Sequence, residues 1–224
     1  MSRVLAIGDI HEPCSKEGYL EFCQDMYEAW ECDTVVFIGD VVDHHAISFH
    51  AANPEAPGPK KEAELTLAGI QKWAKVFPEA RVCLGNHDKR VARLAGASKI
   101  TSFFIKDYKD AWKTPEWDWK PKHIIDGVRY FHGEKCSGVH PAYNAARKRG
   151  QSVVIGHCHS RGGVKWLCND ENRWFGMDVG TGVDDDKWAF TYAEEQIEKS
   201  ILACGIVIDG MPYHEMMPTE QYKS

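Results

Sequence analysis

Five short apolar runs, each ending at or near a glycine with a polar side chain beside it, form the clearest pattern along the chain. They occupy residues 4–11, 34–43, 80–88, 127–133 and 152–159. Continuous apolar runs of this length are typical of strands that are buried on both faces. A glycine at a strand end lets the backbone turn sharply and approach a bound group closely. We therefore expect five buried strands whose ends carry the chemistry.

Patterns with a helical period separate several of these runs. Apolar residues recur at spacings of three and four in residues 16–30 and 60–77. Residues 140–150 have Pro141 near their start and Gly150 just past the last helical position, as helices often do. Strands that alternate with helices predict the α/β class, with a sheet covered by helices. Ligands of such sheets gather beyond the carboxyl ends of the strands.

The later part of the chain has a different pattern. Residues 162–180 predict two strands around a turn signal at 169–170, and residues 200–210 predict a further strand. We expect these to form a second sheet of antiparallel hairpins. Two segments, around 43–61 and 111–121, are interpreted as loop insertions that border the strand ends.

Length and composition then limit the class of protein. A chain of 224 residues that is 43% hydrophobic can form a single domain over residues 1–224. The net charge of −6 argues against a general nucleic-acid surface, although a local basic patch can hide within that average. No apolar run approaches the roughly 18 residues of a membrane span, and no export signal is visible. We expect a soluble cytoplasmic protein whose eight cysteines, without a C-x-x-C pair, are reduced thiols.

The predicted strand ends supply seven side chains with oxygen or nitrogen donors. These are Asp9, His11, Asp40, Asn86, His132, His157 and His159. Residues two apart on an extended segment point the same way, so Asp9 and His11 can share a face. Seven donors are too many for one four-coordinate zinc ion and suit two ions that share a bridging carboxylate. Any one of the histidines would more often be structural, but several polar side chains at buried strand ends are costly without metals.

The same residues resemble the motifs of the calcineurin-like metallophosphoesterases. The family pattern D-x-H, G-D-x-x-D, G-N-H-[DE], a lone His and G-H-x-H is met in order by residues 9–11, 39–43, 85–88, 132 and 156–159. Each fragment is weak alone, and five in order are a specific signal. The resemblance implies a two-sheet β-sandwich flanked by helices, in an αββα arrangement.

The resemblance also implies how the donors are divided. One metal ion would be held by Asp9, His11, Asp40 and His159, and the other by Asp40, Asn86, His132 and His157. His87 would face the substrate and protonate the leaving oxygen, and Asp43 would orient His87. The alternative for Asp43 is a loop cap.

Two divalent ions on these donors would leave the cluster positive and suited to a phosphate anion. Metals about 4 Å apart lower the pKa of a bridging water and orient it for attack on phosphorus. We therefore expect a hydrolase of a small phosphodiester or phosphomonoester that uses a metal-bridging hydroxide as its nucleophile. Manganese is the expected metal, and iron, zinc, nickel or cobalt also suit the donor types.

Two other functions stay open at this point. A nuclease or nucleic-acid end-processing enzyme is suggested by the tryptophans of residues 111–121, which could stack a base, although ordinary packing is the more common role of such side chains. Nucleic acid is therefore possible as a partner but not favoured. A noncatalytic scaffold that binds a protein partner would need no His87. The sequence does not indicate an oligomeric state.

The group that would grip the phosphate oxygens is not identified by the motifs. Protein serine/threonine phosphatases of this superfamily have Arg-Gly after the second motif, where this chain has His44-His45. Candidates for the clamp are Arg90, Arg93 and Arg161. We interpret His44, His45 and His50, as well as the acidic run 184–186, as solvated loop residues.

Overall fold

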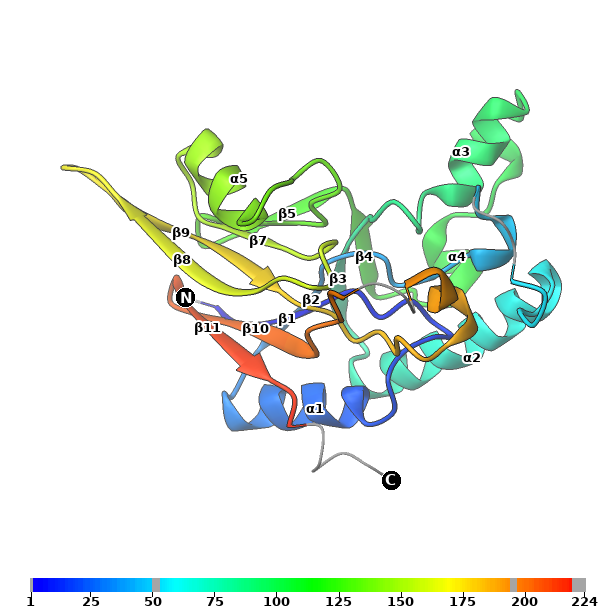
Figure 1. The fold of residues 1–224 in the computed structure, drawn as a ribbon, viewed down its shortest axis with the longest axis horizontal. Coiled ribbons are helices and arrows are strands. Elements are labelled where there is room, and N and C mark those ends of the chain that lie inside the picture. The colour runs from blue at the N-terminus through cyan, green and yellow to red at the C-terminus, as the bar shows by residue number, and fades with distance from the viewer. Residues whose placement is uncertain (1, 50–52, 194–196, 219–224) are drawn as a thin grey trace.

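Two β-sheets packed face to face, with helices against their outer faces, form the computed structural model, which describes residues 2–49, 53–193 and 197–218 (Figure 1). The predicted α/β class and two-sheet sandwich are therefore confirmed. None of the described helices is both long and apolar enough to cross a membrane.

The first sheet is built around parallel strands from the N-terminal half of the chain. Its order is β11-β10-β1-β2-β3-β4, with β1 at Arg3–Ile7, β2 at Thr34–Phe37, β3 at Ala80–Cys83, β4 at Trp117–Lys120, β10 at Ala203–Ile208 and β11 at Met211–Met216. Strands β1 to β4 run parallel, and β10 and β11 add an antiparallel hairpin next to β1. The parallel strands end at the same edge, so the residues that follow them meet there.

The second sheet contains the remaining strands, again with a parallel centre. Its order is β5-β6-β7-β9-β8, with β5 at Lys122–Ile125, β6 at Val128–Phe131, β7 at Val153–Ile155, β8 at Gly162–Cys168 and β9 at Arg173–Val179. Strands β6, β7 and β9 are parallel, whereas β5 and β8 are antiparallel to their neighbours. The ends of β6 and β7 reach the same region as the ends of β1 to β3.

Within the described residues, five helices and three 3₁₀ segments connect these strands. They are α1 (Tyr19–Ala29), α2 (Pro59–Val76), α3 (Arg90–Ala97), α4 (Tyr108–Trp112), α5 (Pro141–Arg149), η1 (His45–Ile47), η2 (Ser102–Phe104) and η3 (Trp188–Ala193). The expected helices at 16–30, 60–77 and 140–150 correspond to α1, α2 and α5. Proline begins α2 and α5, where its missing amide hydrogen costs nothing. Gly150 ends α5 in the left-handed conformation.

Three apolar layers hold the architecture together. Between the sheets lie side chains such as Ile38, Tyr130 and Phe175. The outer face of the first sheet packs against α1 and α2 through a cluster that includes Phe22 and Trp73. The outer face of the second sheet packs against the alanines of α5. Both sheets are thus buried on both faces where their central strands run, which explains the continuous apolar runs.

The structure corrects two predictions about the later segments. The strand expected within 200–210 belongs to the first sheet, where β10 pairs with β1, so the hairpins do not form one second sheet. Residues 111–121 are not a loop insertion, because they include the end of α4 and the whole of β4. The tryptophans in this segment pack inside: Trp117 is fully buried and Trp112 nearly so.

Candidate metal centre

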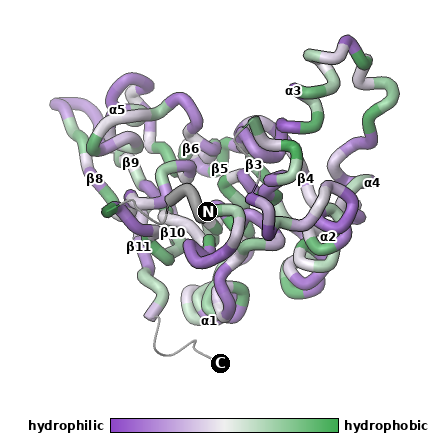
Figure 2. Tube along the Cα trace, turned by 45° about the vertical axis from the view of Figure 1, so that its right-hand side comes forward, coloured by the Kyte–Doolittle hydropathy of each residue, from purple (hydrophilic) through white to green (hydrophobic). Residues whose placement is uncertain are grey.

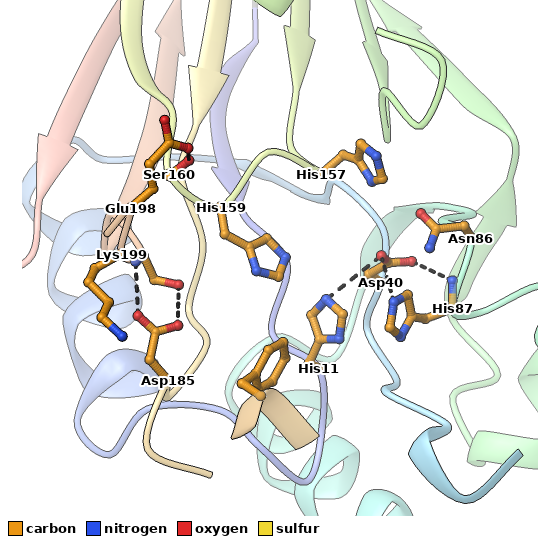
Figure 3. A pocket seen from close by; sticks show the side chains of 12 residues that line it. His11, Asp40, Asn86, His87, His157, His159, Ser160, Asp185, Glu198 and Lys199 are labelled. Carbon is orange, nitrogen blue, oxygen red and sulfur yellow. Dashed lines mark hydrogen bonds and ion pairs between the residues drawn. The ribbon is translucent and has the colours of Figure 1, made fainter. Parts of the chain in front are cut away.

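Seven polar side chains converge where strands of both sheets end, and Figure 3 shows five of them: His11, Asp40, Asn86, His157 and His159. The ends of β1, β2 and β3 place Asp9, His11, Asp40 and Asn86, and the ends of β6 and β7 place His132, His157 and His159. The first sheet thus contributes four of the predicted donors and the second sheet three. The structure brings all seven of these side chains into one region.

The backbone at this edge adopts conformations that most residues avoid. His11, Asp40 and His157 have φ angles of 45°, 46° and 70°. Non-glycine residues in this region carry strain that the surrounding structure must offset, and such residues cluster at functional sites. The motif glycines let two carboxylates lie close to the backbone. A Cβ on Gly85 would collide with the carboxylate of Asp40, and a Cβ on Gly156 would collide with that of Asp9.

The first group of donors consists of Asp9, His11 and His159, whose ligand atoms all lie within 4.8 Å of one another. His159 Nε2 is 3.2 Å from Asp9 Oδ2. Among the described residues, Asp9 Oδ1 and His11 Nε2 are buried without any hydrogen-bond partner. Buried polar atoms are normally satisfied, so these two orphaned atoms fit a cation at this position.

The second group consists of Asp40, His132 and His157, with Asn86 beside them. His132 Nε2 lies 3.1 Å from Asp40 Oδ2, 2.9 Å from Asn86 Oδ1 and 3.1 Å from His157 Nδ1. Several potential ligand atoms therefore point at one small volume. Imidazole, carboxylate and amide donors in this arrangement suit a transition-metal ion.

Asp40 lies between the two groups. Its Oδ2 is 3.1 Å from His132 Nε2 and 3.7 Å from His11 Nε2, and its Oδ1 accepts a hydrogen bond of 2.8 Å from the amide of His87. Oδ2 of this carboxylate therefore approaches histidines of both groups.

The electrostatics of the centre favour positive charge. Burial by itself raises the pKa of Asp40, but the charges of His132 and His87 outweigh it and hold that pKa well below its usual range. Burial lowers the pKa of His132, yet Asp40 and Asp9 overcome this and raise it to about 10. Two buried carboxylates thus attract positive charge, as a proton when no cation is bound. A divalent ion would satisfy the same need.

Asp43 and His87 lie directly beside the donors. Asp43 Oδ1 is 2.8 Å from His11 Nδ1 and 3.2 Å from His87 Nδ1, while the Asp43 carbonyl oxygen is 2.7 Å from His87 Nδ1. Although burial raises the pKa of Asp43, hydrogen bonds from the two histidines bring it far below its usual value. The carboxylate is therefore ionised and contacts both rings.

Arg90 is the arginine nearest to this pair. Its Nη2 is 3.1 Å from His87 Nε2, and its Nη1 donates to the carbonyl oxygens of Asp43 and His44 at 2.9 and 3.0 Å. The side chain is largely buried. Of the other two clamp candidates, Arg161 pairs with Glu198 at 3.0 Å and Arg93 lies over the ring of Phe49.

Asp88 is a functional neighbour that the motif contains but to which sequence reasoning gave no role. Its buried carboxylate accepts the amides of Gly85, Asp40 and Val41 at 2.8, 2.9 and 3.0 Å. These bonds tie the turn after β3 to the turn after β2. The signal was its place directly after Asn86 and His87, at a position that the motif restricts to Asp or Glu. Asp88 therefore positions the donors on both turns.

The structure corrects the prediction that the histidines after Asp43 are solvated loop residues. His45 is 8% exposed, and its amide donates to the carboxylate of Glu62. Burial lowers the pKa of His44 to about 4, so this ring is neutral, as expected, but partly buried and not fully solvated. The 3₁₀ turn η1 folds both residues against α2, which the local sequence did not indicate. His50 lies outside the described residues.

The acidic run 184–186 also differs from the solvated loop that we expected. Asp184 accepts a 2.8 Å hydrogen bond from Lys16 and is mostly buried, whereas Asp186 is exposed. Asp185 binds the hydroxyl and the amide of Ser200 at 2.6 and 2.9 Å. Two of the three carboxylates thus fix the segment that forms one wall of the cleft.

A cleft of about 250 Å³ opens over the donors. His11, Asp40, Asn86, His87, His157 and His159 form its floor, and Ser160, Asp185, Phe190, Glu198, Lys199 and Ser200 line the other side (Figure 3). Five of the seven candidate ligands, together with His87, therefore face one open space that a substrate can enter.

Comparison of the sequence with known families gives a match over most of its length. The family described as calcineurin-like phosphoesterase matches residues 2–179. This range contains all seven donors together with Asp43, His87 and Asp88. No curated protein matches the sequence.

Solved structures that resemble this one are distant in sequence. The phosphoesterase YfcE from E. coli is 12% identical, with a TM-score of 0.47 over 99% of this chain and 95% of that one. A metallophosphoesterase from Sphaerobacter thermophilus is 14% identical, with a TM-score of 0.48 over 99% and 89% of the two chains. Vps29 from Chaetomium thermophilum is 9% identical, with a TM-score of 0.49 over 98% and 93%. The match to the family is the stronger of these findings.

Proposed function

Because the chain belongs to the calcineurin-like phosphoesterase family, we propose that it hydrolyses phosphoester bonds with two divalent metal ions held at the strand ends. The observation that carries the proposal is the convergence of seven donors with two buried, unpartnered ligand atoms among them. Manganese is the metal proposed, and iron, zinc, nickel and cobalt suit the same donors.

The donors divide into two sets that share Asp40. One ion is assigned to Asp9, His11, Asp40 and His159, and the other to Asp40, Asn86, His132 and His157. When bound, such ions supply Lewis acidity at the phosphate and a water nucleophile of lowered pKa. The chain's own groups fix where those ions and the substrate can lie.

Hydrogen bonds set the tautomers of two of these histidines. His11 Nδ1 donates to Asp43 Oδ1 at 2.8 Å, and His132 Nδ1 donates to the carbonyl oxygen of Ile38 at 3.1 Å. Each bond leaves a lone pair on Nε2, which faces the centre. Partners of this kind orient metal-binding histidines and increase their basicity.

His87 is proposed as the general acid. Its Nδ1 donates to the carbonyl oxygen of Asp43, so its Nε2 faces the cleft, 4.0 Å from Asp40 Oδ2. Burial lowers the pKa of His87, but Asp40 and Asp43 together raise it above its usual value, which favours the protonated ring. When Nε2 carries a proton, the Arg90 guanidinium, which can only donate, must turn away from it, and that proton would pass to the leaving oxygen as the phosphoester bond breaks.

Arg90 is proposed as the group that binds the phosphate oxygens. Its Nη2 already reaches His87 Nε2 at the edge of the cleft, whereas Arg161 is paired with Glu198. The two backbone carbonyls bound to Nη1 hold the guanidinium in place without neutralising it. A fixed positive charge beside the acid would stabilise the charge that develops on the phosphate.

The experiment that tests this proposal is a panel of aryl phosphate monoesters and diesters, assayed after the purified protein is loaded with manganese, iron, zinc, nickel or cobalt. The cleft of about 250 Å³ has room for one phosphoester unit and a small attached group. We expect turnover of at least one ester class, loss of turnover with a chelator, and recovery on adding metal back. Absence of turnover with every metal, in protein whose metal content is verified, would refute the proposal.

A further inference from the structure

An arm of residues 90–107 leaves the sandwich directly after the candidate acid His87 (Figure 2). It consists of α3, a turn, the short η2 and the link to α4. Every residue from 96 to 104 is exposed, including Phe103 at 86% and Phe104 at 76%. Exposing two adjacent phenylalanines to water costs free energy, because their apolar surface is hydrated. Such a surface indicates a binding site that a partner covers.

The arm is also basic, in a chain with a net charge of −6. Residues 89–109 contain six lysines and arginines but only one acidic residue, Asp107. Lys89 pairs with Glu134, and Arg90 is largely buried against His87. Within the described ranges, Arg93, Lys99, Lys106 and Lys109 are exposed and form no salt bridge. Arg93 lies over the ring of Phe49, so Lys99, Lys106 and Lys109 are the cations that remain available to a partner.

A second cavity lies between the arm and α4. It has a volume of about 400 Å³ and is lined largely by apolar and aromatic side chains, among them Val91, Ile105, Tyr108 and Trp112. His44 and Asp88 also border it, and Asp88 directly follows His87, which lines the cleft over the donors. A flat ring could thus lie here while an attached phosphate approaches His87.

We propose that the arm binds a strand of single-stranded nucleic acid and leads its phosphodiester to the neighbouring metal centre. The inference rests on the proposed hydrolase function and names its substrate class. Exposed aromatic rings stack on bases of any sequence, and interleaved cations neutralise backbone phosphates. The combination of Phe103 and Phe104 with Lys99 and Lys106 provides both on one short segment.

The position of the arm favours a strand that continues into the cleft. The eight residues of α3 span about 12 Å, which three or four stacked nucleotides would cover at about 3.4 Å each. The cleft itself takes one phosphoester unit, so the adjoining nucleotides need a surface outside it. The arm begins three residues after His87 and supplies that surface.

The test measures binding separately from hydrolysis. A fluorescein-labelled oligothymidylate of about 12 nucleotides is titrated with the protein in a chelator, and its anisotropy is followed. We expect Phe103→Ser combined with Phe104→Ser to weaken binding at least tenfold, since each lost stacking contact costs about tenfold or more. A matched control, Ile124→Ser on β5, removes an exposed apolar side chain elsewhere and should leave the affinity unchanged.

The salt dependence tests the cations. Replacing Lys99 and Lys106 by glutamine should reduce the slope of log affinity against log salt by about 1.4, since each phosphate contact on a single strand contributes about 0.7. Lys122→Gln, an exposed lysine on β5, is the matched control and should leave the slope unchanged.

An assay of turnover on a small aryl phosphodiester, which is too short to reach the arm, tests the proposed hydrolase independently of this inference. The arm variants should retain that turnover while losing the cleavage of oligonucleotides. Oligonucleotide binding without any hydrolysis would preserve the arm inference and remove the hydrolase. The inference is overturned if the wild-type protein does not bind the oligonucleotide, or if the arm variants bind it as well as the wild type does. It is also overturned if Phe103 and Phe104 are needed only for binding to anionic vesicles or for self-association.

Discussion

The metal centre and the arm show two opposite ways of placing reactive side chains. At the centre, Asp40 is buried, and its neighbours hold its backbone and both carboxylate oxygens at fixed distances. In the arm, Phe103 and Phe104 contact each other edge to face but are otherwise exposed. The centre is organised in advance, whereas the arm presents side chains whose contacts must come from a partner.

The difference indicates where each kind of mutation acts. A change in the centre alters groups that support one another, so it affects metal binding, catalysis and stability together. A change in the arm removes contacts that do not yet exist in the protein alone. Surface substitutions of that kind usually alter stability by less than about 0.5 kcal/mol.

The largest effect is expected from Asp40→Asn. This carboxylate lies between both donor groups, so the variant should lose most bound metal and reduce phosphoester hydrolysis to background. Elemental analysis and an aryl phosphate assay measure the two losses. Asp110→Asn, on an exposed helix, is the control. Full metal content in the Asp40 variant would contradict the bridging role.

The next largest effect is expected from His87→Ala, which tests catalysis separately from metal binding. His87→Ala should keep the metal content but slow hydrolysis of esters with poor leaving groups by about 10² to 10⁴, the range typical of general acids. The loss should shrink for nitrophenyl esters, which need little protonation. His140→Ala, at an exposed position, should have no effect. Equal losses with both leaving groups would argue against the acid role.

A pair of identical substitutions compares the centre and the arm directly. Gly85→Ala would force a Cβ into the carboxylate of Asp40. It should therefore lower the free energy of unfolding by about 3 kcal/mol, the upper end of the usual range for overpacking. Gly96→Ala in α3 meets no atom within 4 Å and should stabilise the protein by about 0.5 to 1 kcal/mol. Urea denaturation measures both. Similar shifts in the two variants would contradict the contrast.

The last effect concerns Asp178, a buried carboxylate that accepts fewer backbone hydrogen bonds than Asp88 does. Asp178 Oδ1 has no partner among the described residues, and burial raises the pKa of Asp178 to about 7. The folded protein then holds a proton that the unfolded chain releases near pH 4, so stability falls between about pH 4 and 7. Asp178→Asn should remove the contribution of this group, which is at most roughly 4 kcal/mol for a shift of three pKa units, so the variant should be more stable than the wild type at pH 8.

The stability curves of the two proteins should therefore coincide below pH 4 and separate as the pH rises. Asp170→Asn, in the exposed turn between β8 and β9, should follow the wild-type curve throughout. A difference between Asp178→Asn and the wild type that does not change with pH would show that the carboxyl group is not the cause.

Local patterns were enough to predict the strands that carry the donors. The runs before Asp9, Asp40 and His157 are buried on both faces, so their apolar character is continuous and easy to recognise. The α/β class followed because helices separate these strands. The convergence of the donors followed from the family motifs and from the rule that parallel strands end at one edge.

Non-local features were missed because no short pattern encodes them. The pairing of β10 with β1 joins residues about two hundred positions apart, and no local pattern specifies which sheet a hairpin enters. The short strand β4 lies between two prolines, which favour a loop. The burial of His45 and the exposure of Phe103 depend on what packs against them, so a single sequence does not reveal them.

The division of the donors between the sheets links cation affinity to the assembly of the sandwich. Four candidate ligands belong to one layer and three to the other, so neither layer alone presents all of the proposed donors. An ion bound there crosslinks the layers and is released when they separate. By thermodynamic reciprocity, the melting temperature should rise with free metal concentration, and a chelator should make the interface between the two layers open more readily.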